Sequence, residues 1–240
     1  MIFELIEDVT KMALIVVSLY FVLGAYVRRK QPAWSEPLEK RRLTTLLVLV
    51  LAVSAVKISE DVLGGESGLI DKAILLFIQR YVPSALIGFF EAVTLTGSSW
   101  FLFPLTTVVT IALLYAKHRF EALLVAASVI SATIVIYLVK MLVGRARPAL
   151  WDTEWYWGSS FPSGHTLVVA AFATAATLCV SQIRPASRNL ALSLAILWIV
   201  LVAISRLVLG VHWPTDVLAA ACIGAFLPLA MSVVLELRHT

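Results

Sequence analysis

The chain has 240 residues, of which 60% are hydrophobic and 14% are charged, and its formal net charge is +4. Because about a quarter of the residues in an average soluble domain are charged, this composition excludes an ordinary soluble protein. It predicts an integral membrane protein.

Seven apolar stretches are candidates for membrane spans, each of which needs about 20 mostly apolar residues. The stretches are continuous rather than alternating, so we expect helices and not barrel strands. Glu4, Glu7 and Asp8 stand where a cleaved signal peptide would be basic, so we expect the first stretch to remain. The prediction is an all-α fold, a polytopic transmembrane helical bundle of about six to seven spans. The stretches are residues 10–27, 43–58, 98–116, 120–140, 165–183, 189–208 and 215–236.

The short loops between these stretches differ in their content of Lys and Arg, which collect on the cytoplasmic side of a membrane. Every second loop is basic, so these loops are expected to be cytoplasmic. The N-terminus, residues 59–97, residues 141–164 and residues 209–214 are then expected outside. The basic residues are Arg28, Arg29, Lys30, Lys40, Arg41, Arg42, Lys117, Arg119, Arg184, Arg188 and, after the last stretch, Arg238.

Residues 69–97 are expected to form interfacial structure rather than a span. Residues 84–97 are apolar but too short to cross, and the segment before them has apolar residues at helical spacing with charged ones between, which indicates an amphipathic helix. The alternative is a helix packed on the outer ends of the bundle. The apolar positions are Leu69, Ile70, Ala73, Ile74, Phe77, Ile78 and Tyr81, and the polar ones are Asp71, Lys72, Gln79 and Arg80.

The first polar cluster lies at the outer end of stretch 120–140. It contains Lys140, Arg145 and the pair Arg147–Pro148. Basic residues at a helix end can simply reach the membrane surface, but the positive-inside bias disfavours this explanation at an outer end.

The second cluster is Pro162, Ser163, Gly164 and His165, immediately before stretch 165–183. Ser163 is a good N-cap, and Gly164 allows close approach, so backbone N–H groups and the helix dipole are expected to face outward. Such a helix start is an anion site. The alternative is a plain helix start with an incidental histidine.

The third cluster contains Ser205, Arg206, His212 and Asp216. A histidine and an aspartate at i, i+4 lie on one helical face, where the carboxylate can hold one imidazole tautomer. Because Pro214 indicates a helix start, His212 could precede the regular helix. The second and third clusters are separated by two crossings, and no crossing separates the first two, so all three are expected on the outer side.

Together the clusters suit a phosphoryl group. Cations and the N–H groups of Ser163, Gly164 and His165 can surround the nonbridging oxygens of a phosphate. One imidazole can attack phosphorus and the other can protonate the leaving oxygen. Asp216 favours His212 as the nucleophile, and His165 is then the general acid. No set of Asp, Glu or Cys suggests a metal site, so no metal is expected; Cys179 and Cys222 lack metal or redox spacing.

The segments Lys140–Pro148, Pro162–His165 and Ser205–Asp216 resemble the three-part signature of the type-2 phosphatidic acid phosphatase superfamily, which also includes vanadium haloperoxidases. The resemblance covers about residues 69–236. It implies Lys140, Arg147, Ser163, Gly164 and Arg206 as phosphate ligands, His165 as the acid, His212 as the nucleophile with Asp216 as its partner, and no cofactor.

The resemblance also implies a division into an N-terminal transmembrane hairpin, 1–68, and a phosphatase core bundle, 69–240. Membrane members usually have six spans, so either the first stretch is not a full span or this chain carries an addition. The expected location is a bacterial inner membrane with an extracytoplasmic active site. The expected partners are a lipid phosphate and membrane lipids, with no nucleic acid.

Two other functions fit parts of the pattern. A soluble vanadate-using haloperoxidase would not need the apolar exterior, and a non-catalytic phosphate-lipid binding protein or transporter would have charges through the membrane midplane. The sequence does not select among phosphatidate, phosphatidylglycerophosphate, undecaprenyl diphosphate and lipid A phosphate. The aromatic residues between the first two clusters are expected either to anchor at the headgroups or to frame substrate entry; they are Trp151, Trp155, Tyr156 and Trp157.

Overall fold

The computed structural model describes residues 2–150 and 158–237, and regular structure in these residues is helical throughout. This confirms the all-α prediction. The aromatic residues Trp151, Trp155, Tyr156 and Trp157 lie outside the described residues. The helices are α1 Ile2–Lys30, α2 Ser35–Lys40, α3 Arg42–Gly64, α4 Gly68–Tyr81, α5 Ile87–Leu95, α6 Ser99–Tyr115, α7 Arg119–Val143, α8 Gly164–Ile183, α9 Arg188–Val208 and α10 Pro214–Leu237, with short 3-10 turns at Pro32–Trp34, Ser84–Leu86 and Pro185–Ser187.

Five helices of the described chain are long and apolar enough to cross a membrane: α1, α7, α8, α9 with the turn before it, and α10. A sixth span results if α4 and α5, which are bent by 98°, are counted as one. The expected range of six to seven is therefore reduced to five or six. The predicted span 98–116 forms α6, whose 17 residues make a helix about 25 Å long, shorter than a hydrocarbon core of about 30 Å. Helix α3, which contains the predicted span 43–58, is not among the five either. Its uncharged stretch ends at Val56, before Lys57.

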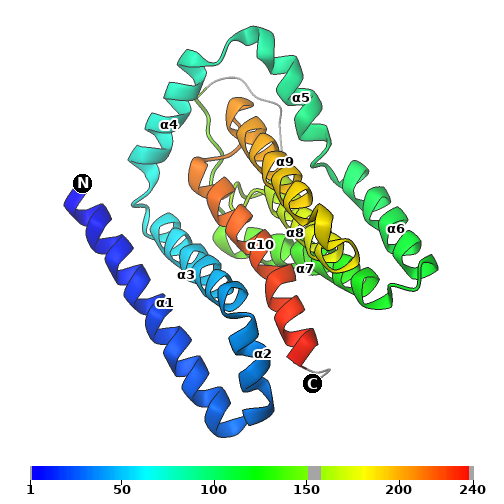
Figure 1. Cartoon of the computed structure of the whole chain (residues 1–240). Helices are drawn as coiled ribbons and strands as arrows, with labels where there is room; N and C mark the ends of the chain where they lie inside the picture. Colours follow the sequence, from blue (N-terminus) through cyan, green and yellow to red (C-terminus); the bar gives the residue numbers. More distant parts are fainter. Residues whose placement is uncertain (1, 151–157, 238–240) are drawn as a thin grey trace.

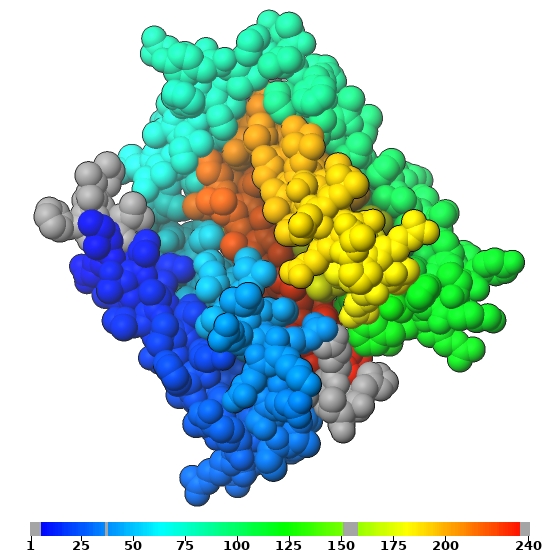
Figure 2. All heavy atoms as spheres, viewed as in Figure 1, coloured from blue at the N-terminus to red at the C-terminus, as the bar shows by residue number. Residues whose placement is uncertain are grey.

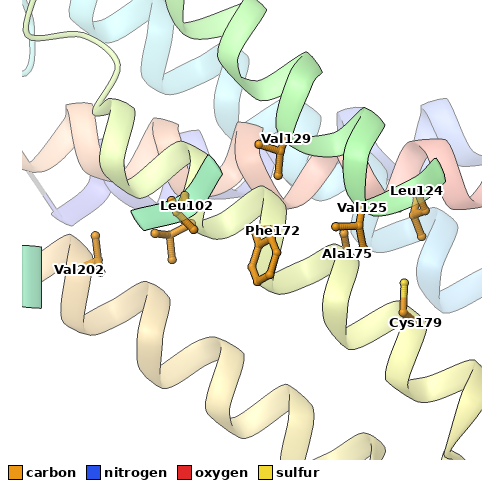
Figure 3. Close-up of a cluster of buried hydrophobic side chains, with 9 residues drawn as sticks. Leu102, Leu124, Val125, Val129, Phe172, Ala175, Cys179 and Val202 are labelled. Carbon is orange, nitrogen blue, oxygen red and sulfur yellow. The ribbon is translucent and has the colours of Figure 1, made fainter. Parts of the chain in front are cut away.

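Helix α8 is the centre of the bundle, because it packs against α6, α7, α9 and α10. Figure 3 shows one part of this core, in which Val125 and Val129 of α7 lie beside Phe172 and Ala175 of α8. Small residues let α10 approach closely. A methyl group at Gly224 of α10 would overlap the Leu167 carbonyl and lie 2.7 Å from Ala170 Cβ.

Helices α1 and α3 lie along one edge of the bundle. Helix α1 lies against α3, and α3 lies against α10. Figure 1 shows α1 at the outer edge, and Figure 2 shows it as a ridge on the surface beside α2 and α3. The division into a hairpin 1–68 and a core 69–240 stays a prediction.

Helices α4 and α5 form an arch over the end of the bundle where α9 ends and α10 begins (Figure 1). Helix α4 packs against both of those helices, as in the alternative of a helix packed on the outer ends. Asp71, one of the polar positions of the predicted amphipathic helix, is 0% exposed, whereas the apolar position Leu69 is 86% exposed. The apolar face of α4 therefore points away from the bundle, and one carboxylate points into it.

Candidate active site

The three polar clusters meet at one end of the bundle. Lys140 lies in the last turn of α7, His165 in the first turn of α8, Arg206 in the last turn of α9 and Asp216 in the first turn of α10. Antiparallel neighbours bring these helix ends together. His165 lies within electrostatic range of Lys140, Arg147, Arg206 and His212. The sequence thus predicted correctly that the clusters converge.

His212 and Asp216 form a buried pair, 2% and 0% exposed. His212 Nδ1 lies 3.4 Å from Asp216 Oδ2, and the same oxygen accepts a hydrogen bond of 2.9 Å from the Trp213 N–H. His212 precedes α10, which begins at Pro214. The contact still forms because Asp216 reaches back over the first turn, in the manner of a helix capping residue.

The contacts of His212 select one tautomer. A carboxylate only accepts, so Nδ1 must carry the proton, and an arginine only donates, so the Nε2 atom that lies 3.5 Å from an Arg147 nitrogen must hold the lone pair. Both neighbours therefore favour an imidazole with its lone pair directed toward Arg147. That atom is the nucleophilic one.

Burial lowers the pKa of His212 to about 4, with Arg206 and Arg147 acting in the same direction and Asp216 opposing them. A neutral imidazole is stabilised because desolvation disfavours the charged form. At neutral pH His212 therefore keeps the lone pair that nucleophilic attack needs.

The three predicted phosphate-binding cations are held in place by neutral oxygens. Lys140 donates to the Ser159 carbonyl at 2.8 Å, Arg147 to the Val211 carbonyl at 2.8 Å, and Arg206 to the Thr94 hydroxyl at 2.6 Å. These contacts orient the side chains without neutralising their charge. Arg206 is 1% exposed, so its charge lies in a dry environment where an anion is bound more strongly than in water.

The start of α8 differs in detail from the prediction. Ser163 is the N-cap residue, but its hydroxyl pairs with the Thr166 hydroxyl at 3.1 Å instead of capping the backbone. Its N–H is not available to an anion, because it donates to the Asp216 carbonyl at 3.1 Å. The N–H groups of Gly164 and His165 lie in the first turn, where a helix offers no internal acceptor.

Three residues that received no role from the sequence also contact this site. Arg145, noticed only as a third cation, binds Asp216 and Asp71, and Thr94 of α5 anchors Arg206. A charged residue in an apolar helix is a signal of function, and for Asp71 this signal was available. No pattern in the sequence singled out Thr94.

An apolar cavity of about 150 Å³ adjoins His165 between α6, α7 and α8. Leu102, Ile136 and Val168 contribute to its wall. Gly97 lines it as well, and a methyl group there would lie 2.9 Å from Val202 Cγ1 and 3.2 Å from His165 Cβ. A side chain at position 97 would therefore displace His165 or Val202.

Within residues 2–150 and 158–237, no three side chains of the His, Cys, Asp or Glu type lie close enough to hold a metal ion. Metal-independent chemistry remains a prediction. Cys179 and Cys222 are free thiols in α8 and α10.

Comparison with known proteins finds one matching family. The model of the PAP2 superfamily matches residues 121–239, which contain all eight predicted site residues. Phosphatidylglycerophosphatase B of Bacillus subtilis is 27% identical over 184 residues, which cover 75% of this chain and 89% of that protein. Phosphatidylglycerophosphatase B of Escherichia coli K12 is 41% identical over 67 residues, but the match covers only 28% of this chain and 25% of that protein.

The fold also matches a solved structure, the transmembrane PAP2 type phosphatidylglycerolphosphate phosphatase from Bacillus subtilis. The TM-score is 0.69 at 24% identity, and the match covers 80% of this chain and 96% of that one. At this identity the likeness establishes the fold.

Proposed function

Because residues 121–239 belong to the PAP2 superfamily, we propose that the chain is a membrane phosphatase that removes the terminal phosphate of a lipid phosphate or diphosphate. The observation that carries the proposal is the His212–Asp216 pair, whose geometry leaves the Nε2 lone pair facing Arg147. A nucleophile held beside cations is suited to attack on a phosphoryl group.

In the proposed reaction His212 Nε2 attacks phosphorus in line with the ester oxygen. The P–O bond breaks as the P–N bond forms, and His165 gives its proton to the departing alkoxide. A dianionic phosphate bound beside His165 favours the protonated form of its imidazole, from which the proton is given. Water, deprotonated by His165, then attacks the phosphohistidine, which releases inorganic phosphate and restores both imidazoles.

The remaining predicted residues are proposed to hold the nonbridging oxygens. Lys140, Arg147 and Arg206 supply charge-assisted hydrogen bonds, each contributing about 1.5 to 3 kcal/mol. The backbone N–H groups of Gly164 and His165, at the start of α8, are proposed to donate to the same oxygens. Since the Ser163 N–H is engaged, Ser163 is proposed to act through its hydroxyl.

The apolar cavity beside His165 supports a lipid as the leaving group. The first atoms of the substrate beyond the ester oxygen must lie next to the general acid, and here the adjoining walls are Leu102, Ile136 and Val168. An apolar stem fits this surface better than a hydrated sugar or nucleoside does.

The proposed location is a bacterial inner membrane with the active end outside the cytoplasm. The basic loops at Lys117–Arg119 and Arg184–Arg188 lie at the helix ends opposite the candidate site, and basic loops collect on the cytoplasmic side.

Purified protein tests this function directly. Phosphate release is measured in excess EDTA on phosphatidate, phosphatidylglycerophosphate, undecaprenyl diphosphate and lipid A 1-phosphate, with His212→Ala as the inactive reference. Release from at least one lipid by the wild type alone is expected. Binding of all four lipids with no release would instead favour the non-catalytic binding protein, and activity that appears only with added Mg²⁺ would contradict the metal-free mechanism.

A further inference from the structure

Arg145 occupies the centre of a buried charge network beside the candidate site. One of its terminal nitrogens donates to Asp216 Oδ1 at 2.6 Å and to the Thr215 hydroxyl at 2.8 Å. The other donates to Asp71 Oδ2 at 2.7 Å and to the Ser67 hydroxyl at 3.1 Å. Arg145 thus joins two carboxylates, from α10 and from α4.

The backbone and the guanidinium plane of Arg145 are fixed as well. Its N–H donates to the Ser159 hydroxyl at 2.9 Å, and its carbonyl accepts from the Ser160 N–H at 2.8 Å. Its guanidinium lies over the Trp213 ring, 5.6 Å from the centroid. A planar fork held on all sides can dictate the orientation of the groups it binds.

Asp71 fixes the network to the start of α10. Its two oxygens accept from the Thr215 N–H at 3.0 Å and from the Thr215 hydroxyl at 2.6 Å. The side chains of Asp71 and Asp216 are 1% and 0% exposed. Two buried carboxylates this close to one another are stable only with a shared cation, and Arg145 is that cation.

The two oxygens of Asp216 have different partners. Oδ1 is bound by Arg145, and Oδ2 is bound by the Trp213 N–H and faces His212 Nδ1. If Oδ1 lost its partner, the carboxylate could rotate and His212 would lose the acceptor that selects its tautomer. Arg145 is therefore placed to act on the nucleophile through Asp216.

We propose that Arg145 and Asp71 are positioning residues that fix the Asp216 carboxylate and, through it, hold His212 as the Nδ1–H tautomer with an unprotonated Nε2 atom. The inference deepens the proposed function and rests on it for its kinetic consequence. It assigns a role to α4, a helix outside the matched family region.

The first arm of the test is kinetic. Arg145→Met should lower kcat about 10- to 100-fold, the range found when outer hydrogen-bond partners of a metal-binding histidine are removed, with KM changed less than about 3-fold. Arg145→Lys should be intermediate, because a lysine keeps the charge but not the fork. Asp71→Asn should also lower kcat, but by a smaller factor than Arg145→Met. Lys72→Met, which removes the exposed cation next to Asp71, is the matched control.

A double-mutant cycle separates positioning from a general structural role. In an Asp216→Asn background the Arg145→Met change should cost less than about 3-fold in kcat, because the group through which Arg145 acts is already altered. An equal loss in both backgrounds, or no loss in the wild type, would overturn the inference.

The second arm does not depend on activity. Nitrogen-15 NMR of labelled histidines, with His212 assigned by difference from His212→Gln, should show an Nδ1–H tautomer in the wild type and a mixture with Nε2–H in Arg145→Met and Asp71→Asn. An unchanged tautomer in both variants would refute the positioning role. A wild type with no phosphatase activity but with the expected tautomer shift would refute the proposed function alone.

Discussion

Helices α8 and α1 are both apolar and both long enough to span a membrane, but they have opposite surroundings. In an apolar segment of 18 residues taken from each helix, half of the α8 segment is buried inside the protein, compared with 6% of the α1 segment. Helix α8 carries small residues such as Ala170, Ala171 and Ala175 where neighbours approach, whereas α1 carries exposed large ones such as Leu14 and Phe21. Because lipid is as apolar as leucine, side-chain size rather than hydropathy distinguishes a protein-facing helix from a lipid-facing one.

Apart from the loss of the nucleophile itself, the largest expected effect concerns the start of α8, where the buried helix meets the proposed chemistry. His165→Ala should lower kcat on lipid phosphates about 100- to 10,000-fold, the usual contribution of general acid–base catalysis. On an aryl phosphate with a good leaving group the first step, measured as the initial burst of released aryl alcohol, should be slowed much less, because that group departs without a proton. The control is His118→Ala, which lies just before α7, at the end of that helix away from Lys140 and the candidate site. Slowing of the first step by the same factor on both substrates would show that His165 is not the acid.

A matched pair of glycines sharpens the comparison through stability. Gly224→Ala places a methyl group against the α8 backbone and should destabilise the fold by about 1 to 3 kcal/mol, as overpacking does. Gly24→Ala in α1 meets only the end of the Arg28 side chain, at 3.9 Å, and should be neutral or stabilise by up to about 1 kcal/mol. Thermal unfolding in detergent measures both. Similar shifts for the two variants would mean that α8 and α1 are packed alike.

A further expected effect is on stability at acid pH. The pKa of His212 is lowered to about 4 from an ordinary value of 6.5, so between these values the unfolded chain binds more protons than the folded one. The contribution of His212 is fully present above pH 6.5 and is lost as the pH falls toward 4. The melting temperature should therefore fall over this window in the wild type and less in His212→Gln. Protonation of His212 near pH 6.5 in nitrogen-15 NMR would contradict the assignment.

The candidate site was largely predictable because topology constrains it. Residues 141–164 join the first two clusters without a crossing, and α8 and α9 return the chain to the same side, so Lys140, His165 and His212 had to share one end of the bundle. Local chemistry then indicated the pairing of His212 with Asp216. None of these steps required knowledge of side-chain contacts.

The polar partners of the site were less predictable. Asp71 received no partner from the sequence, because helical periodicity shows which residues share a side of α4 but not which side meets the bundle. The availability of the Ser163 N–H depended on a long-range bond to the Asp216 carbonyl, which no sequence pattern indicates. The upper end of the expected span count, seven, is not reached in the described residues, because α6 is apolar throughout but only 17 residues long. Hydropathy shows the composition of a stretch better than the length of its helix.

The most direct test of the account is to trap the covalent intermediate. Enzyme mixed with a lipid substrate labelled with phosphorus-32 is quenched in alkali, which preserves phosphohistidine, and the labelled residue is located by peptide mapping. The account predicts label on His212, no label in His212→Ala, and label that persists or accumulates in His165→Ala when an aryl phosphate is the donor. Label on His165, or undiminished label in His212→Ala, would contradict the assignment of His212 as the nucleophile.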